Sequence, residues 1–346
     1  MQAVRLHKYE EPPVVDEVAE PEITDPLDVI VRIGGAGLCR TDLHIIEGQW
    51  KEKSGVSLPY TLGHENAGWV HEVGSAVTNV AEGDAVIVHP LRSCGFCRAC
   101  RAGDDMHCAA CLFPGIDTDG GFAELLKSNA RAVVRLPSGV EPRDVAAHAD
   151  AGLTAYHAVK KAAEILHPGT TAVVIGAGGL GHIGIQSLKV LTAARVVVVD
   201  RSEASLDLAR ESGADDVVVA DGGEVEAVQE RTDGLGAEAV LDFVGEGGAL
   251  EASIAMLQEG GTHYVIGYGG VLSVPAIDII AAEINVVGSL VGTYNELAEL
   301  MTLQAEGKVA LHTSTYPLDA ANDAIDDLDA GRLHGRGILV PAANPV

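Results

Sequence analysis

The amino-acid sequence predicts an α/β protein that combines an irregular antiparallel β domain with a doubly wound parallel sheet. A length of 346 residues suggests about two domains, each large enough to bury a hydrophobic interior. The sequence pattern changes after residue 169, from one typical of short strands and turns to one typical of strands that alternate with helices.

The first part of the chain is predicted to be strand-and-turn structure. Its apolar segments are brief, rich in Val and Ile, and closed by Gly, Pro or Asp. Examples are residues 28–33, 68–73 and 84–88. We therefore expect an antiparallel domain up to about residue 149.

The second part is predicted to form parallel strands separated by helices. The expected strands are residues 171–175, 196–199, 217–220, 239–243, 263–266 and 285–287. Their spacing of about 20 to 25 residues leaves room for a helix between neighbours, which favours a doubly wound sheet. Helices at residues 295–303 and 320–330 and a last strand at 337–340 should follow.

The chain is strongly acidic. It has 50 Asp and Glu residues against 23 Lys and Arg, a formal net charge of −27. Such a surface repels nucleic acid and anionic lipid, so we expect no nucleic-acid partner and no membrane partner. The acidity serves solubility or, since only eight of the cations are Lys, reflects adaptation to high salt.

Targeting signals are not evident in the sequence. No apolar run approaches the roughly 18 residues of a membrane helix, and residues 1–10 hold no apolar core of signal-peptide length. We therefore expect a cytoplasmic protein. In a reducing cytoplasm, six cysteines with four crowded into one segment favour metal ligands over disulfides.

A glycine-rich string follows the strand predicted at residues 171–175. It consists of Gly176, Ala177, Gly178, Gly179, Leu180 and Gly181. A helical stretch comes next and Asp200 ends the following strand, which is the context of a dinucleotide-binding turn. Glycines there let a pyrophosphate approach the amides of a helix N-terminus. The alternative is a turn that only packs strand on helix.

Asp200 also predicts which dinucleotide binds. A carboxylate accepts hydrogen bonds from both hydroxyls of an adenosine ribose and repels a 2′-phosphate, which favours NAD over NADP. Arg201 stands beside it and could instead meet a 2′-phosphate, so NADP remains the alternative.

Four cysteines form a cluster with metal-site spacing. Cys94, Cys97, Cys100 and Cys108 follow one another in steps of three, three and eight. Four thiolates saturate a tetrahedral zinc with no open position, which is typical of structural sites. An iron–sulfur cluster is the alternative, and a nucleic-acid zinc finger is disfavoured by the acidity of the chain.

A second candidate site lies at residues 61–68. His64 stands beside Glu65, and Gly63 and Gly68 flank them, so that the backbone can pass close to a buried centre. A histidine satisfied in the core or at the surface is the alternative, unless other ligands join it.

These motifs, in this order, resemble the zinc-containing medium-chain alcohol dehydrogenases along essentially the whole chain. The likeness is greatest to bacterial and archaeal enzymes that act on secondary alcohols and ketones or on a broad alcohol range. It implies a GroES-like catalytic domain over 1–152 with a structural-zinc lobe at 92–111. A Rossmann domain over 153–289 and a return to the catalytic domain over 290–346 should follow.

The resemblance implies a catalytic zinc held by Cys39, His64 and Asp150, with Glu65 as an alternating ligand. The third ligand is usually a cysteine, and this chain departs from the pattern by placing Asp150 there. An Asp oxygen is an acceptable zinc ligand. His148 could compete for the position, and Cys111 is the only spare thiol.

The resemblance also implies a proton relay. Thr41 would pass the proton of the alcohol through the cofactor ribose to His44, unless His44 is an ordinary surface residue. Asp42 would orient His64 from behind, or else cap a helix. Arg40 would sit near the pyrophosphate of the cofactor or be solvated.

The sequence thus predicts an NAD-dependent alcohol dehydrogenase with two zinc ions per subunit, which interconverts a small alcohol with its aldehyde or ketone. Pocket candidates Leu43, Trp50 and Leu91 are apolar or bulky, which favours simple alcohols over a polyol or sugar. A non-catalytic NAD-binding structural or redox-sensing relative is the rival from another class. The resemblance also implies homo-oligomers, a tetramer rather than a dimer, with sheet edges near residues 285–289 pairing across a two-fold axis.

Overall fold

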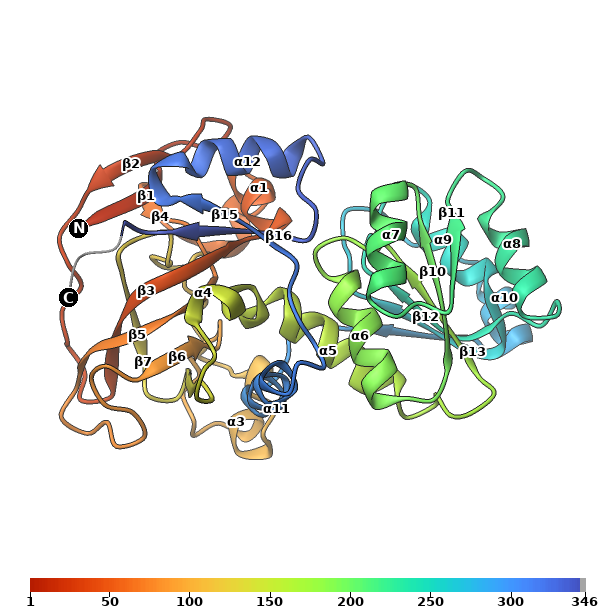
Figure 1. Cartoon of the computed structure of the whole chain (residues 1–346), viewed down its shortest axis with the longest axis horizontal. Helices are drawn as coiled ribbons and strands as arrows, with labels where there is room; N and C mark the ends of the chain where they lie inside the picture. The colour runs from red at the N-terminus through yellow and green to blue at the C-terminus, as the bar shows by residue number, and fades with distance from the viewer. Residues whose placement is uncertain (343–346) are drawn as a thin grey trace. The chain divides into compact units, whose positions relative to one another are not determined.

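The structure is a computed structural model that describes residues 1–342, and its contacts divide the chain into two compact units (Figure 1). Unit 1 comprises Met1–Leu153, Thr293–Gly307 and the described residues from 311 onward. Unit 2 comprises Thr154–Gly292 and Lys308–Ala310. The chain therefore leaves unit 1, completes unit 2, and returns.

Unit 1 is built on two sheets that are mainly antiparallel. Its larger sheet has the order β15-β16-β3-β5-β6-β8, with β7 also paired to β3, and its smaller sheet has the order β2-β1-β4. The strands are β1 (Gln2–Leu6), β2 (Val14–Glu17), β3 (Asp28–Leu38), β4 (Tyr60–Thr61), β5 (Glu65–Val73), β6 (Ala85–Val88), β7 (Leu125–Asn129), β8 (Val133–Arg135), β15 (Thr313–Pro317) and β16 (Arg336–Val340). The predicted antiparallel domain is confirmed.

Unit 1 also contains short helices. They are α1 (Arg40–Ile46), α2 (Lys51–Ser54), α3 (Arg98–Ala102), α4 (Pro142–Val145), α11 (Tyr294–Ala305) and α12 (Ala321–Asp329), with 3-10 turns η1 (Asp105–His107), η2 (Ala146–Ala149) and η3 (Leu318–Ala320). Helix α5 (Ala151–Ala162) begins in unit 1 and ends in unit 2. The helices predicted at 295–303 and 320–330 correspond to α11 and α12.

Strand β3 is longer than predicted. It continues through glycine-rich residues 34–37 to Leu38, where the sequence suggested a turn after residue 33. Glycine is needed at Gly37 because a Cβ there would lie 2.0 Å from Oε2 of Glu65 on the neighbouring strand β5. The glycines thus mark a close approach between two strands and not a chain reversal.

Unit 2 is a doubly wound parallel sheet with the order β11-β10-β9-β12-β13-β14. Its strands are β9 (Thr171–Ile175), β10 (Arg195–Asp200), β11 (Asp216–Val219), β12 (Ala237–Asp242), β13 (Leu257–Val265) and β14 (Asn285–Gly288). Its helices are α6 (Gly181–Leu191), α7 (Glu203–Glu211), α8 (Glu224–Arg231), α9 (Ala249–Ala255) and α10 (Ala276–Ala282). The predicted sheet is confirmed, and its order reverses between β9 and β12, where such folds bind nucleotides.

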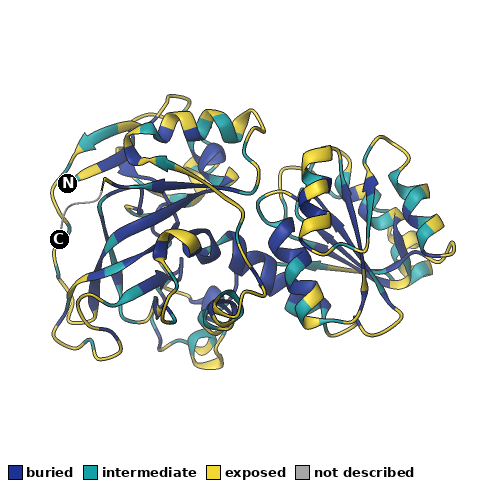
Figure 2. Ribbon diagram, in the orientation of Figure 1, coloured by how far each residue is buried: buried dark blue, intermediate teal, exposed yellow. Residues whose placement is uncertain are grey.

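Alternating side chains place hydrophobic clusters on both faces of this sheet. Its central strands are coloured as buried in Figure 2. Val174 and Val198 pack toward α5 and α6, whereas Val173 and Val197 pack toward α8 and α9. Strand β13 begins at Leu257 and not at the predicted residue 263. Its first part contains Gly260 and Gly261, where the pairing with β12 is irregular.

Candidate active site

Four sequence-predicted residues come together in unit 1. One ligand atom each from Cys39, His64, Glu65 and Asp150 lies within 4.8 Å of the others. Cys39 precedes α1, His64 precedes β5, Glu65 is the first residue of β5, and Asp150 lies between η2 and α5. His64 Nε2 is 3.5 Å from Asp150 Oδ2, and Cys39 Sγ is 4.0 Å from the same oxygen. The first three are buried, and Asp150 is nearly so.

The chemistry of this group fits a divalent metal. Within the described residues, both ring nitrogens of His64 are buried and make no hydrogen bond. Burial lowers the pKa of His64, but the nearby carboxylates of Asp42 and Asp150 outweigh it and raise that pKa well above its usual value. The site therefore attracts positive charge to a sulfur, a nitrogen and an oxygen, which is a ligand set for zinc.

Asp42 supports the group from behind. Its Oδ2 accepts a hydrogen bond of 2.8 Å from the backbone N–H of Cys39 and so caps α1. Its Oδ1 lies 3.4 Å from Nδ1 of His64. The two roles weighed for Asp42, helix cap and partner of His64, are divided between its two oxygens. One buried carboxylate thus links the positions of two candidate ligands.

Arg336, which the sequence analysis missed, is the buried partner of Glu65. Its Nη2 donates to Oε1 of Glu65, which also accepts a 3.1 Å bond from the backbone N–H of Ala151. The exposed fractions of the two side chains are 4% and 0%. Burial raises the pKa of Glu65. The positive charge of Arg336 favours the ionised form of Glu65, but burial outweighs it. Glu65 thus lies within the ligand group while it is held by an arginine.

The remaining predicted residues lie around the first helix. Arg40 is exposed and Thr41 half-buried, both in the first turn of α1. His44 is buried in its last turn, and its Nδ1 lies 3.5 Å from Oε2 of Glu47. Of the pocket candidates, Leu43 and Leu91 are buried, and Trp50 packs partly buried against the core of unit 1.

Two further neighbours bear on the candidate metal group. The ring of Phe113, not predicted, meets His64 edge-on with centroids 5.8 Å apart. His148, considered as a competing ligand, is buried, and its Nε2 lies 2.8 Å from Oε1 of Gln304. Burial, partly opposed by this bond, lowers the pKa of His148 to about 4. His148 therefore faces α11 as a neutral imidazole.

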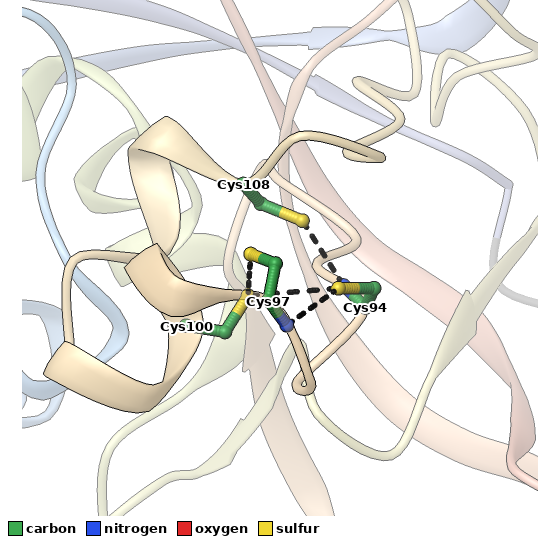
Figure 3. Close-up of side chains that lie close together, drawn as sticks. All are labelled: Cys94, Cys97, Cys100 and Cys108. Atoms are coloured by element: carbon green, nitrogen blue, oxygen red, sulfur yellow. Dashed lines mark hydrogen bonds between the residues drawn. The ribbon is translucent and has the colours of Figure 1, made fainter.

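The four cysteines of the lobe converge on one point (Figure 3). Cys97 Sγ is 3.5 Å from Cys100 Sγ, which is 4.0 Å from Cys94 Sγ. Backbone N–H groups point at the sulfurs, as from Cys94 to Cys108 at 3.3 Å. N–H groups of Cys100 and Ala109 lower the pKa of Cys97 to about 6. Burial, by contrast, raises the pKa of Cys100 to about 11. Four convergent sulfurs suit a tetrahedral metal.

The nucleotide fingerprint lies at the junction of β9 and α6 in unit 2. A Cβ on Gly181 would fall 1.8 Å from the carbonyl oxygen of Gly176, so the helix can start this close only with glycine. A Cβ on Gly178 would meet nothing within 4 Å, which leaves an open approach to the loop. Asp200 Oδ2 accepts a 2.8 Å bond from the N–H of Ala177 and so fixes the loop from β10.

Comparison with known families agrees with these features. The alcohol dehydrogenase GroES-like domain matches residues 25–138, and the zinc-binding dehydrogenase family matches residues 179–306. An irregular β unit with grouped metal-ligand side chains and a doubly wound unit with a nucleotide fingerprint define a medium-chain dehydrogenase.

Individual relatives match the whole chain. It is 36% identical to an NAD-dependent alcohol dehydrogenase of Sulfurisphaera tokodaii, over 99% of this chain and 100% of the relative. It is 37% identical to D-arabinose 1-dehydrogenase (NADP(+)) of Saccharolobus solfataricus, over 98% and 97%. The crystal structure of the alcohol dehydrogenase from Aeropyrum pernix matches with a TM-score of 0.96 and 45% identity, over 99% and 100%. The chain belongs to the zinc-containing medium-chain alcohol dehydrogenase family.

Replacing Arg336 with Gln should lower the free energy of unfolding by about 3–5 kcal/mol, because Glu65 would stay buried without its partner. The shift is measurable by denaturant unfolding of the metal-loaded protein. Arg332→Gln is the control, since Arg332 pairs with Asp327 at the surface and should contribute less than about 1 kcal/mol. Equal effects of the two substitutions would contradict the role given to Arg336.

Proposed function

We propose that the protein is an NAD-dependent zinc alcohol dehydrogenase that interconverts a primary or secondary alcohol with its aldehyde or ketone. The observation that carries the proposal is the buried group of Cys39, His64 and Asp150, a set of three ligands that leaves a fourth position for substrate. The named activities of the full-length relatives support the same reaction. A small-molecule substrate and a cytoplasmic location go with this proposal.

In the proposed reaction, a bound zinc supplies a Lewis acid that lowers the pKa of an alcohol oxygen. The chain contributes orientation and proton transfer. Asp42 fixes the ring of His64 and the backbone of Cys39 together, so the ligands keep their geometry. Thr41 can accept and donate a proton, and His44 faces the exposed Glu47, which supports a route to water.

Two zinc ions per chain, one in each group, are part of the proposal. The four-cysteine group uses all four tetrahedral positions and suits a structural ion, whereas the Cys–His–Asp group suits a catalytic one. Glu65 is proposed as an alternating ligand, since its Oε1 accepts from Arg336 while its Oε2 makes no hydrogen bond among the described residues.

NAD is the proposed cofactor because Asp200 ends β10 beside the glycine-rich loop. Its negative charge would repel a 2′-phosphate, while free lone pairs of the carboxylate remain for ribose hydroxyls. Arg40, Gly179, Leu180 and the exposed Arg201 remain proposed contacts to the cofactor.

A substrate panel tests the proposed reaction. Zinc-loaded protein should oxidise simple primary or secondary alcohols with NAD at a higher kcat/KM than polyols or aldose sugars. Steady-state rates with NAD and with NADP, at low and molar salt, are the measurement. The second candidate, a sugar dehydrogenase, is favoured by the 37% identity to D-arabinose 1-dehydrogenase. Preference for sugars would select that candidate, and turnover of neither class would favour a non-catalytic relative.

Asp150→Asn should abolish turnover and release one of the two zinc ions, because a neutral amide binds zinc more weakly than a carboxylate. Metal content and rate are measured on the same preparation. Asp144→Asn is the control, since Asp144 is an exposed carboxylate outside the ligand group. Retention of both zinc ions and of full activity would exclude Asp150 as a ligand.

Oligomer formation is proposed from an apolar surface on unit 2. Strand β14 ends the sheet order, and large apolar side chains around it and α10 are exposed. They are Tyr268, Val271, Ile277, Ile280, Val286 and Leu290. An open strand edge with apolar flanks suits a second copy of this chain paired across a two-fold axis, within a tetramer.

Ile280→Glu should reduce the oligomer to smaller species, because it places a charge in the proposed interface. Light scattering after size exclusion, at one fixed salt concentration, gives the mass. Leu235→Glu is a matched control, since Leu235 is exposed to 71% and Ile280 to 70% but Leu235 lies outside this surface. An unchanged mass for Ile280→Glu would place the interface elsewhere.

A further inference from the structure

Asp242 organises the loops at the carboxyl edge of the sheet in unit 2. It is the last residue of β12, and its Oδ1 accepts bonds from the N–H groups of Val244 at 2.8 Å and Gly245 at 2.9 Å. Its carbonyl oxygen accepts from Ile266 and Gly267, which follow β13. One residue thus joins the turns after two neighbouring strands.

The turn held by Asp242 packs against the nucleotide fingerprint. A Cβ on Gly176 would lie 2.6 Å from Cγ2 of Val244, so this turn seats directly on the first glycine of the loop. On its other side, a Cβ on Gly245 would lie 2.1 Å from the backbone of Gly267. Because the Val244 side chain fills the space beside Gly176, a shift of the turn would change the packing of the glycine-rich loop.

The second oxygen of Asp242 faces a buried histidine. His263 lies on β13 opposite Val240, on the same face of the sheet as Asp242. His263 Nε2 is 3.8 Å from Asp242 Oδ2, and both side chains are 0% exposed. Among residues 1–342, this oxygen and both ring nitrogens of His263 make no hydrogen bond, and Asp242 has no other ion-pair partner.

A buried carboxylate without a partner is strongly unfavourable. Backbone N–H groups satisfy one oxygen of Asp242, and the imidazole of His263 is the group that faces the other. Removing the imidazole would leave the carboxylate to reorient or to draw in water, and either change would release the turn that rests on Gly176.

We propose that His263 is a positioning residue for the dinucleotide. It acts indirectly, by holding Asp242 and the turn at residues 243–245 in place. The inference rests on the proposed function, since it assumes that NAD(H) binds at the fingerprint of unit 2. His263 does not touch the reacting atoms, so its loss should weaken cofactor binding and leave the chemical step nearly unchanged.

The test compares cofactor binding in the zinc-loaded full chain and its variants. His263→Leu should raise the NADH dissociation constant about tenfold, measured by NADH fluorescence. Asp242→Asn should raise it less, because the amide oxygen can still accept from Val244 and Gly245. The kcat of His263→Leu at saturating NAD should stay within about twofold of the parent. The double variant should bind NADH more tightly than His263→Leu, because a neutral Asn needs no counter-group.

Tyr264→Phe is the matched control, because it removes a buried hydroxyl from the next position of β13, on the opposite face of the sheet. Its NADH affinity should equal that of the parent. If His263→Leu does not fold, His263→Gln paired with Asp242→Asn provides the same cycle. Parent-like NADH affinity in folded His263 variants, or strictly additive effects, would overturn this proposal alone. Failure of the parent to bind NADH would overturn the proposed function as well.

Discussion

The structure of unit 1 depends on one constraint, that charged groups buried side by side must neutralise one another. A thiol, an imidazole, two carboxylates and a guanidinium meet around Cys39, His64 and Asp150, and a further carboxylate, Asp42, lies behind them. Each would be costly alone in an apolar interior. The sheet order, which sets β3 between β5 and β16, brings Glu65 and Arg336 together. The strand order of unit 1 therefore also determines which charged groups are paired in the candidate site.

In unit 2, close packing and carboxylate hydrogen bonds hold the loops at the carboxyl ends of the strands. Its turns after β12 and β13 are packed backbone to backbone, and the Val244 side chain packs against Gly176 of the glycine-rich loop. Two carboxylates at strand ends fix these loops, Asp200 through Ala177 and Asp242 through Val244 and Gly245. The loops that would hold an anionic cofactor are thus held by acidic side chains. Side-chain oxygens accept the N–H groups that secondary structure leaves unpaired at strand ends.

Local patterns in the sequence predicted much of this structure. The period of the strands indicated the parallel sheet, and β9 has the predicted bounds. Spacing alone indicated the four-cysteine group, because its ligands are neighbours in the chain. Arg336 and His263 were missed because each acts on a partner brought close only by strand pairing, and no local motif marks either of them. Glycines misled twice, at β3 and β13, where a close approach and an irregular strand resemble turns.

The order in which the chain is synthesised gives the Glu65–Arg336 pair a consequence for folding. Arg336 follows Glu65 by 271 residues, so a growing chain carries the carboxylate long before its counter-charge exists. Nearly all of unit 2 lies between them as one continuous segment, Thr154–Gly292, and can complete its sheet first. The interior of unit 1 can close without an unpaired charge only after β16 has left the ribosome. The Glu65–Arg336 pair can therefore form only when nearly the whole chain has been synthesised.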